Sequence, residues 1–261
     1  MRIEQIRNAT IRVTYKGTTF LVDPWLAPKD GFGCFAELPF ELRDSQKRHV
    51  SMPICELVMP VEEILKGVDY YLITHIHPDH IDMAPDGTVG RFLDKKIPVL
   101  VQNEEDAQVF KNSGFESVQV VSEQGSRIGE ARITKVPAVH GTLVPFGHAM
   151  GVMMEGEEKT LYIAGDTVWC SEVEKNLDTY QPQVIVLNAC AAELGTFGRL
   201  LMDDHETELV IKAAPQAEII ISHMDNVAHA TISRTMMEDY LKEKKLFEHV
   251  RIPEDGESME F

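Results

Sequence analysis

Short apolar runs with alternating polar positions dominate residues 1–164. Residues 11–15 and 18–22 form two such runs joined by Lys16-Gly17, which predicts a β-hairpin. Helices are predicted at residues 61–66 and 104–112, the second capped by Asn103. The further strands predicted in this part cover residues 68–73, 97–101, 117–121, 131–136, 151–155 and 159–164.

After residue 164 the pattern changes to an alternation of helices with continuous apolar strands. Strands are predicted at residues 184–187 and 218–221, and their unbroken apolar runs are typical of strands covered on both faces. The predicted helices begin at a capping box opened by Ser171, at Asp203 or Asp204, and at Thr231. These helices suffice to cover both sides of two sheets, and because the composition never shifts sharply we expect one domain over residues 1–261.

Residues 26–58 break the pattern. They are rich in glycine, proline and charge, and they show no sustained period. A loop of this length inside a domain is usually functional. We therefore expect residues 26–58 to form a lid over a site or to shape its pocket, with Arg43, Lys47 and Arg48 as candidates for binding a phosphate group.

The composition of the chain limits the kinds of partner that the protein is expected to bind. The chain has 25 basic and 42 acidic residues, a net charge of −17, which argues against nucleic acid as a partner. No apolar run reaches the roughly 20 residues that cross a bilayer, so we expect no membrane insertion. The N-terminal residues do not resemble a signal peptide and the four cysteines form no CxxC pair, which together predict a cytoplasmic protein with free thiols. The sequence leaves open whether the protein forms a homo-oligomer.

Histidines cluster in the stretch ITHIHPDHID, residues 73–82. The chain has ten histidines, and three of them lie at positions 75, 77 and 80. A metal site, a pH-sensitive loop and a chance cluster all remain open on this stretch alone. In an extended segment His75 and His77 share a face and can bind one ion, whereas Pro78 turns the chain and directs Asp79 and His80 toward a second position.

Other metal-binding residue types follow predicted strands. His140 comes soon after the strand ending at Val136, Asp166 follows the strand ending at Ala164, and His223 follows Ser222. Ligands of α/β proteins gather outside the carboxyl ends of strands, so we expect these side chains to meet the histidine cluster. Imidazole and carboxylate groups suit zinc, manganese and iron, and two such ions can share a carboxylate and a bridging hydroxide.

The motif Thr74-His75-x-His77-x-Asp79-His80, with the later His140, Asp166 and His223, resembles the metallo-β-lactamase superfamily. The blocks IAGDT (163–167) and Asp23-Pro24 resemble the branch of metal-dependent hydrolases that includes ascorbate-6-phosphate lactonase-like and N-acyl-phosphatidylethanolamine phospholipase D-like proteins. The resemblance covers nearly the whole chain. It implies an α/β fold, the four-layer αββα sandwich of this superfamily, and two divalent metal ions, with zinc favoured over manganese and iron.

The resemblance also implies a role for each motif residue. His75, His77 and His140 would hold the first ion, and Asp79, His80 and His223 the second. Asp166 would bridge both ions, and Asp79 could also relay a proton, which makes Asp79 and Asp166 the candidate catalytic residues. His229 is an alternative to His223 as the last ligand, or else contacts substrate.

Two further residues are candidates for supporting the site. Asp23 either ends its strand in an Asx turn or accepts a hydrogen bond from a ligand imidazole, and Asn188 either stops its strand or contacts substrate.

The resulting functional hypothesis is a dinuclear metal-dependent hydrolase, which uses a metal-bridging hydroxide to attack a small ester, lactone, amide or phosphodiester. Two alternatives are kept. One is an iron-dependent oxidoreductase on the same scaffold, and the other is a metal-binding protein without turnover.

Overall fold

The computed structural model describes residues 1–261, apart from the side chain of Glu37. The strands are β1 (Arg2–Arg7), β2 (Thr10–Tyr15), β3 (Thr18–Val22), β4 (Tyr70–Leu72), β5 (Val99–Val101), β6 (Val118–Val120), β7 (Ser126–Ile128), β8 (Ala131–Pro137), β9 (Met150–Glu155), β10 (Leu161–Ile163), β11 (Val184–Asn188), β12 (Glu193–Leu194), β13 (Gly198–Arg199), β14 (Glu218–Ser222), β15 (Val250–Arg251) and β16 (Ser258–Glu260). The helices are α1 (Val61–Leu65), α2 (Glu104–Asn112), α3 (Ser171–Tyr180), α4 (Asp204–Ala213) and α5 (Arg234–Glu243), with short 3-10 turns η1 (Phe35–Glu37), η2 (Ser45–His49) and η3 (Phe247–His249).

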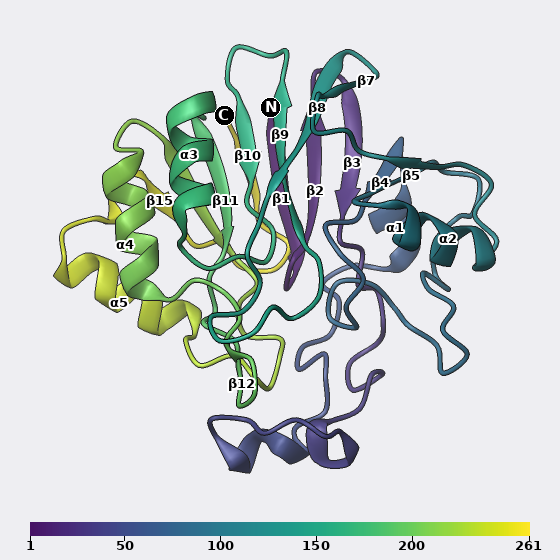
Figure 1. The fold of residues 1–261 in the computed structure, drawn as a ribbon, viewed down its shortest axis with the longest axis horizontal. Helices are drawn as coiled ribbons and strands as arrows, with labels where there is room; N and C mark the ends of the chain where they lie inside the picture. Colours follow the sequence, from purple (N-terminus) through teal and green to yellow (C-terminus); the bar gives the residue numbers. More distant parts are fainter.

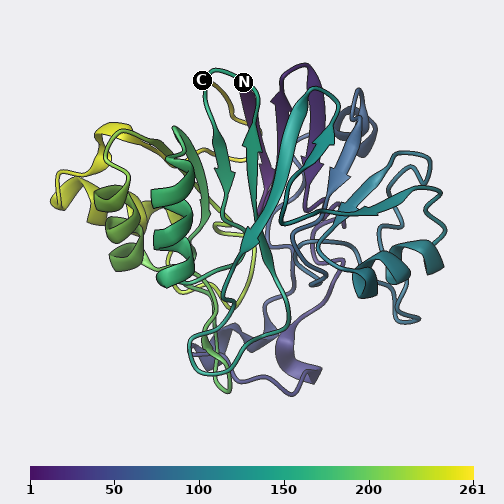
Figure 2. The same cartoon turned by 45° about the horizontal axis from the view of Figure 1, so that its top comes forward.

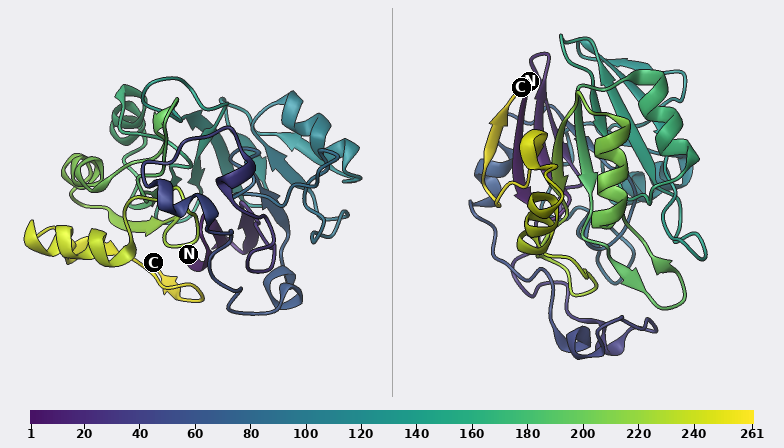
Figure 3. Two further views of the ribbon diagram at one scale, coloured as in Figure 1. Left: turned by 90° about the horizontal axis from the view of Figure 1, so that it is seen from below. Right: turned by 90° about the vertical axis from the view of Figure 1, so that its left-hand side faces the viewer.

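In the chain as described, the strands form two large mixed sheets. One has the order β16-β1-β2-β3-β4-β5-β6, and the other has the order β15-β14-β11-β10-β9-β8-β7. Helices α1 and α2 lie beside the first sheet, whereas α3, α4 and α5 cover the second (Figures 1 and 2). The side view shows the two sheets packed face to face (Figure 3). This arrangement confirms the predicted αββα sandwich.

Alternation along each strand divides the apolar residues among three cores. In β11, Val184 and Val186 pack between the two sheets, whereas Ile185 and Leu187 pack under α3, α4 and α5. Both faces of this strand are therefore buried, as its unbroken apolar run predicted. Strand β3 divides its side chains in the same way, with Phe20 in the core between the sheets and Leu21 in the core under α1 and α2.

Most predicted elements are confirmed, but the cap of one helix and the start of another were predicted wrongly. Helix α3 is capped by Cys170 rather than opened by a capping box at Ser171, whose hydroxyl instead contacts Glu172. Helix α5 begins after Ser233, because the hydroxyl of Thr231 donates a hydrogen bond to the Ala191 carbonyl and does not cap a helix. Asn103 caps α2 as predicted.

The two ends of the chain meet in one sheet. Strand β1 pairs with β2 on one side and with the C-terminal strand β16 on the other, and the termini lie side by side (Figure 1). The apolar pattern of the sequence does not single out either of these outer strands. Strand β1 therefore lies inside the first sheet, and β16 forms its edge.

Residues 26–58 run along one end of the sandwich, below the strand ends in Figure 1 and across them when seen from below in Figure 3. Arg7 holds both ends of this segment, because its guanidinium donates to the Trp25 carbonyl at 2.5 Å and to the Cys55 carbonyl at 3.5 Å. Leu42 pairs with Leu194 of β12, so the middle of the segment rests on the β12–β13 hairpin. The segment thus lies at the end of the sheets where the predicted ligands emerge.

Candidate metal centre

The motif residues emerge from strand ends at one edge of the sandwich. Strand β4 runs parallel to β3, and β10, β11 and β14 run parallel to one another in the second sheet. Parallel strands point their carboxyl ends to the same edge of a sheet. The four segments that follow β4, β8, β10 and β14 therefore bring His75, His140, Asp166 and His223 to a common place.

Three overlapping groups of side chains have donor atoms close enough to share an ion. Within each group the nitrogen and oxygen atoms lie within 4.8 Å of one another, and the groups are His75/His77/His140, His75/His80/Asp166 and Asp79/His80/His223. The structure thus brings together all seven residues proposed as ligands.

Asp166 lies between the two ends of this cluster. Its Oδ2 atom is 3.7 Å from Nε2 of His75, 3.7 Å from Nε2 of His140 and 3.2 Å from Nε2 of His80. Asn188 donates a hydrogen bond of 2.7 Å to the other oxygen, Oδ1. The amide thereby fixes the plane of the carboxylate and leaves Oδ2 directed at the histidines.

Most imidazoles of the cluster have a partner on the side away from its centre. Nδ1 of His80 lies 2.9 Å from the Asp23 carboxylate, and Nδ1 of His140 lies 3.0 Å from the Leu200 carbonyl. Such contacts fix the tautomer of a metal-binding histidine and orient its ring. They leave the Nε2 atoms of both rings facing the cluster.

Asp23 is the main support beneath the cluster. It is buried, with φ of 44°, and its carboxylate accepts hydrogen bonds of 2.7 Å from both the backbone N–H and the hydroxyl of Thr74. The same carboxylate contacts His80. Of the two interpretations of Asp23, the structure therefore shows contact with an imidazole of the cluster.

Burial and neighbouring charges set the protonation of the cluster. Burial and the nearby imidazoles lower the pKa of His75 well below its usual range, and they lower the pKa of His77 to about 3. Burial raises the pKa of Asp166, but the nearby His80 and His223 outweigh burial and hold it well below its usual range. His75 and His77 are therefore neutral, the state in which imidazole binds a divalent metal. Burial lowers the pKa of His80, but the carboxylates of Asp166 and Asp23 outweigh burial and raise it to about 10.

A further observation indicates that the nitrogen and oxygen atoms of the cluster fit a divalent ion. Nε2 of His75 is buried and has no hydrogen-bond partner among the described atoms, and it points into the group with His77 and His140. Nδ1 of His77 and Nε2 of His140 face each other at 3.3 Å. A bound cation would satisfy these converging nitrogen atoms, and imidazole with carboxylate suits zinc, manganese or iron.

His229 lies beside the cluster. Its Nε2 atom is 3.6 Å from Oδ2 of Asp79, close to the 3.4 Å that separates Asp79 from Nε2 of His223. His223 also lies 3.1 Å from Nε2 of His80, whereas His229 packs against the ring of Phe35. His229 thus faces both Asp79 and the adjoining cavity.

The cavity next to the cluster has a volume of about 190 Å³ and mainly apolar walls. Residues 26–58 provide many of its lining side chains: Phe32, Phe35, Leu38, Phe40 and Met52. Phe146, Ala192, Leu194 and Leu200 complete the apolar wall, and the side toward the cluster is formed by His77, Pro78, Asp79, His140, Asp166 and His229. A small apolar group fits this cavity better than a large or charged one.

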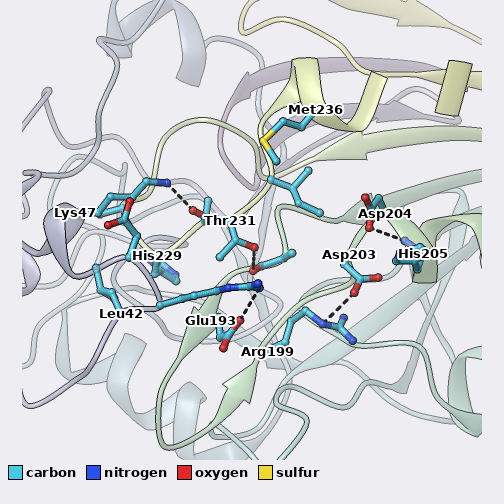
Figure 4. Close-up of a pocket in the computed structure, with 16 residues that line it drawn as sticks. Leu42, Lys47, Glu193, Arg199, Asp203, Asp204, His205, His229, Thr231 and Met236 are labelled. Carbon is cyan, nitrogen blue, oxygen red and sulfur yellow. Dashed lines mark hydrogen bonds and ion pairs between the residues drawn. The ribbon is translucent and has the colours of Figure 1, made fainter. Parts of the chain in front are cut away.

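The basic residues proposed to bind phosphate are engaged elsewhere. Arg48 donates to the backbone carbonyls of residues 35, 36, 38 and 40. Lys47 binds the Ala230 carbonyl and Arg43 pairs with Glu193, both in a separate cavity of about 700 Å³ beyond His229 (Figure 4). Among the described side chains of the 190 Å³ cavity there is no lysine or arginine.

Three contact residues were not predicted from the sequence. Phe146 lies 4.6 Å from His77, measured between ring centroids, and Asn8 donates to the Asp79 carbonyl from the turn between β1 and β2. The thiol of Cys190 lies 3.4 Å from Nδ1 of His223. Each follows from packing between distant segments, and no local motif marks it.

Comparison with known proteins places the chain in a family. The profile of the beta-lactamase superfamily domain matches residues 18–224, and the chain therefore belongs to the metallo-β-lactamase superfamily. It is 38% identical to UPF0173 protein YddR of Bacillus subtilis (strain 168), over the full length of both chains.

Two solved structures share this fold closely. An isothiocyanate hydrolase from Delia radicum gut bacteria is 32% identical, with a TM-score of 0.90 over 100% of this chain and 99% of that one. A possible metal-dependent hydrolase from Veillonella parvula DSM 2008 is also 32% identical, with a TM-score of 0.89 over 99% and 98% of the two chains.

These relatives define the chain as a metal-dependent hydrolase of the superfamily. The narrower branch suggested by the sequence blocks stays a prediction. Among the described residues, no helix is long and apolar enough to cross a membrane.

Proposed function

We propose that the protein is a dinuclear metal hydrolase for small, uncharged substrates that carry an apolar group. The observation that carries this proposal is the apolar cavity of about 190 Å³ that opens directly onto Asp79, His140 and Asp166. Ligand sites are commonly about 300–1,000 Å³, so this cavity suits a small molecule. An ester, a lactone or an amide fits it better than a phosphodiester, because no basic side chain is described in its wall.

The relative from Delia radicum gut bacteria supports a narrower substrate class, organic isothiocyanates. An isothiocyanate is small, uncharged and electrophilic at its central carbon, and its organic group would occupy the apolar part of the cavity. Addition of water across the C=N bond gives a thiocarbamic acid, which releases an amine and carbonyl sulfide. We include isothiocyanates with esters, lactones and amides as candidate substrates.

We assign the first metal position to His75, His77 and His140, the second to Asp79, His80 and His223, and the shared position to Asp166. Divalent ions held there would supply a hydroxide nucleophile near neutral pH and stabilise developing negative charge. His223 is preferred to His229 as ligand because it also faces His80 at 3.1 Å.

The remaining polar groups would act on the substrate or its protons. Asp79 lies where it can receive a proton and pass it on, and His229 can donate a hydrogen bond into the cavity. Asn188 would keep the Asp166 carboxylate in its plane. The segment of residues 26–58 would exclude water from the reacting groups, acting as a wall or lid within a single domain.

The test combines metal analysis with a substrate panel. Protein purified without chelators should contain close to two divalent ions per chain and should hydrolyse benzyl isothiocyanate or phenyl acetate faster than bis(p-nitrophenyl) phosphate. The His77→Ala variant should lose metal and at least about 100-fold in activity, whereas His249→Ala, an exposed histidine far along the chain, should match the wild type.

Wild-type protein without stoichiometric metal, or a His77→Ala variant with full metal and activity, would contradict the proposal. Iron together with oxygen consumption would indicate an oxidoreductase, and metal without turnover on the panel would indicate a binding protein.

A further inference from the structure

Four histidines of the cluster differ in the group that contacts Nδ1, the ring nitrogen that in them faces away from the centre of the cluster. His80 has the Asp23 carboxylate, His140 has the Leu200 carbonyl, and His75 has the Thr74 hydroxyl. His223 instead has the thiol of Cys190, with Sγ at 3.4 Å from Nδ1. Within the described cluster the sulfur contact distinguishes His223 from its neighbours.

Cys190 is held firmly in this place. Its side chain is fully buried, two residues after the end of β11. Its backbone carbonyl accepts hydrogen bonds from Thr231 N at 3.0 Å and from Ile232 N at 3.1 Å. The residue therefore joins the end of β11 to the chain that leaves β14, in which both His223 and His229 lie.

The geometry points to Cys190 as the positioning residue of His223, and this inference rests on the ligand set of the proposed function. An imidazole that binds a metal through Nε2 keeps its proton on Nδ1. The sulfur of Cys190 is the acceptor for that proton. The contact holds Nε2 of His223 toward Asp79 and His80, at 3.4 Å and 3.1 Å.

The nature of the acceptor has a consequence for the two metal positions. Sulfur is a weak hydrogen-bond acceptor, whereas the carboxylate of Asp23 is a strong one. A strong acceptor makes the imidazole a better metal ligand. The contact of His223 is thus the weaker support, and it acts on the second metal position alone, because the first position is formed by His75, His77 and His140.

The experiment measures zinc binding to metal-free protein by competition with a chromophoric chelator, with no substrate present. Cys190→Ala and Cys190→Val remove the acceptor, and Val keeps most of the buried volume. Each should weaken the second equivalent of zinc about 10-fold or more and leave the first equivalent unchanged. Cys190→Ser keeps an acceptor and should bind closer to the wild type.

Cys170→Ala is the matched control, because this partly buried thiol caps α3 without a side-chain hydrogen bond and should leave both equivalents unchanged. Equal zinc binding by the Ala, Val and Ser variants would overturn the inference, because a hydrogen-bond acceptor at position 190 would then make no difference. Loss of both equivalents from a folded variant would overturn it too.

A second measurement covers variants that do not fold. In zinc-loaded wild-type protein, ¹⁵N NMR of the histidine side chains should show His223 protonated at Nδ1. A proton at Nε2 would overturn the inference. Zinc binding that follows these expectations in a protein without hydrolytic activity would leave the role of Cys190 intact and would contradict only the proposed function.

Discussion

At the scale of single residues, the cluster depends on groups that contact no metal themselves. The Asp23 carboxylate contacts the backbone and hydroxyl of Thr74, the residue before His75, and it also contacts the ring of His80. One buried side chain thereby sets the position of groups at both proposed metal positions. Its backbone, at φ of 44°, turns sharply where β3 ends.

We expect Asp23→Asn to weaken metal binding about 10–100-fold, because an amide is a poorer acceptor for the N–H of His80. Calorimetric titration of metal-free protein with zinc measures this loss. Asp69→Asn is the matched control, because Asp69 also accepts a hydrogen bond from a strand N–H, that of Thr19, but is exposed and contacts none of the cluster. Equal losses in the two variants would show that Asp23 has no particular role.

At the scale of elements, the segment of residues 26–58 has an internal order that its sequence does not suggest. The guanidinium of Arg48 donates to the carbonyl of Phe40 at 2.6 Å and to that of Phe35 at 3.1 Å. Both rings line the apolar cavity. Arg48, which was predicted as a candidate for binding a phosphate group, therefore organises the wall of the apolar cavity.

We expect Arg48→Met to loosen this wall, because hydrogen bonds from a charged donor contribute about 1.5–3 kcal/mol each and the carbonyls would be left without partners. Hydrogen exchange at residues 35–40 should become faster while β10 and β11 stay protected. Arg43→Met is the control, since Arg43 makes an exposed pair with Glu193. If hydrogen exchange at residues 35–40 is unchanged in Arg48→Met, Arg48 does not organise this wall.

At the scale of the whole molecule, the proposed ligands come from both sheets. His75, His77, Asp79 and His80 follow β4 of the first sheet, whereas His140, Asp166 and His223 follow β8, β10 and β14 of the second. A bound ion would therefore tie the two halves of the sandwich together. Because the unfolded chain cannot offer these ligands in one place, metal binding should stabilise the fold.

We expect chelation to lower the melting temperature. A ligand at 100 times its dissociation constant adds about 2.7 kcal/mol to the free energy of unfolding. Differential scanning calorimetry with and without zinc should show this difference in the wild type and a smaller one in His223→Ala. His249→Ala should respond as the wild type does, and a wild-type transition that does not move with zinc would contradict the expectation.

The sequence by itself determined the part of this protein that is local. The hairpin of residues 11–22, the buried strands after residue 164 and the histidine motif could all be predicted, because alternation, capping and ligand spacing act over a few residues. Strand ends then indicated which distant residues would join the motif. The pattern of elements predicted two sheets covered by helices, the family resemblance implied the αββα sandwich, and the strand ends predicted a cluster of His140, Asp166 and His223 with the motif.

Only the tertiary structure decided what surrounds the cluster. Cys190, Asn8 and Phe146 contact cluster residues far away along the chain, and each is unremarkable in its own segment. Arg48 was predicted as a candidate for binding phosphate, and only the structure shows that its partners are backbone carbonyls of its own segment. The physical reason is that the outer contacts of an imidazole and the wall of a cavity depend on packing between segments, and packing leaves no periodic signal in the sequence.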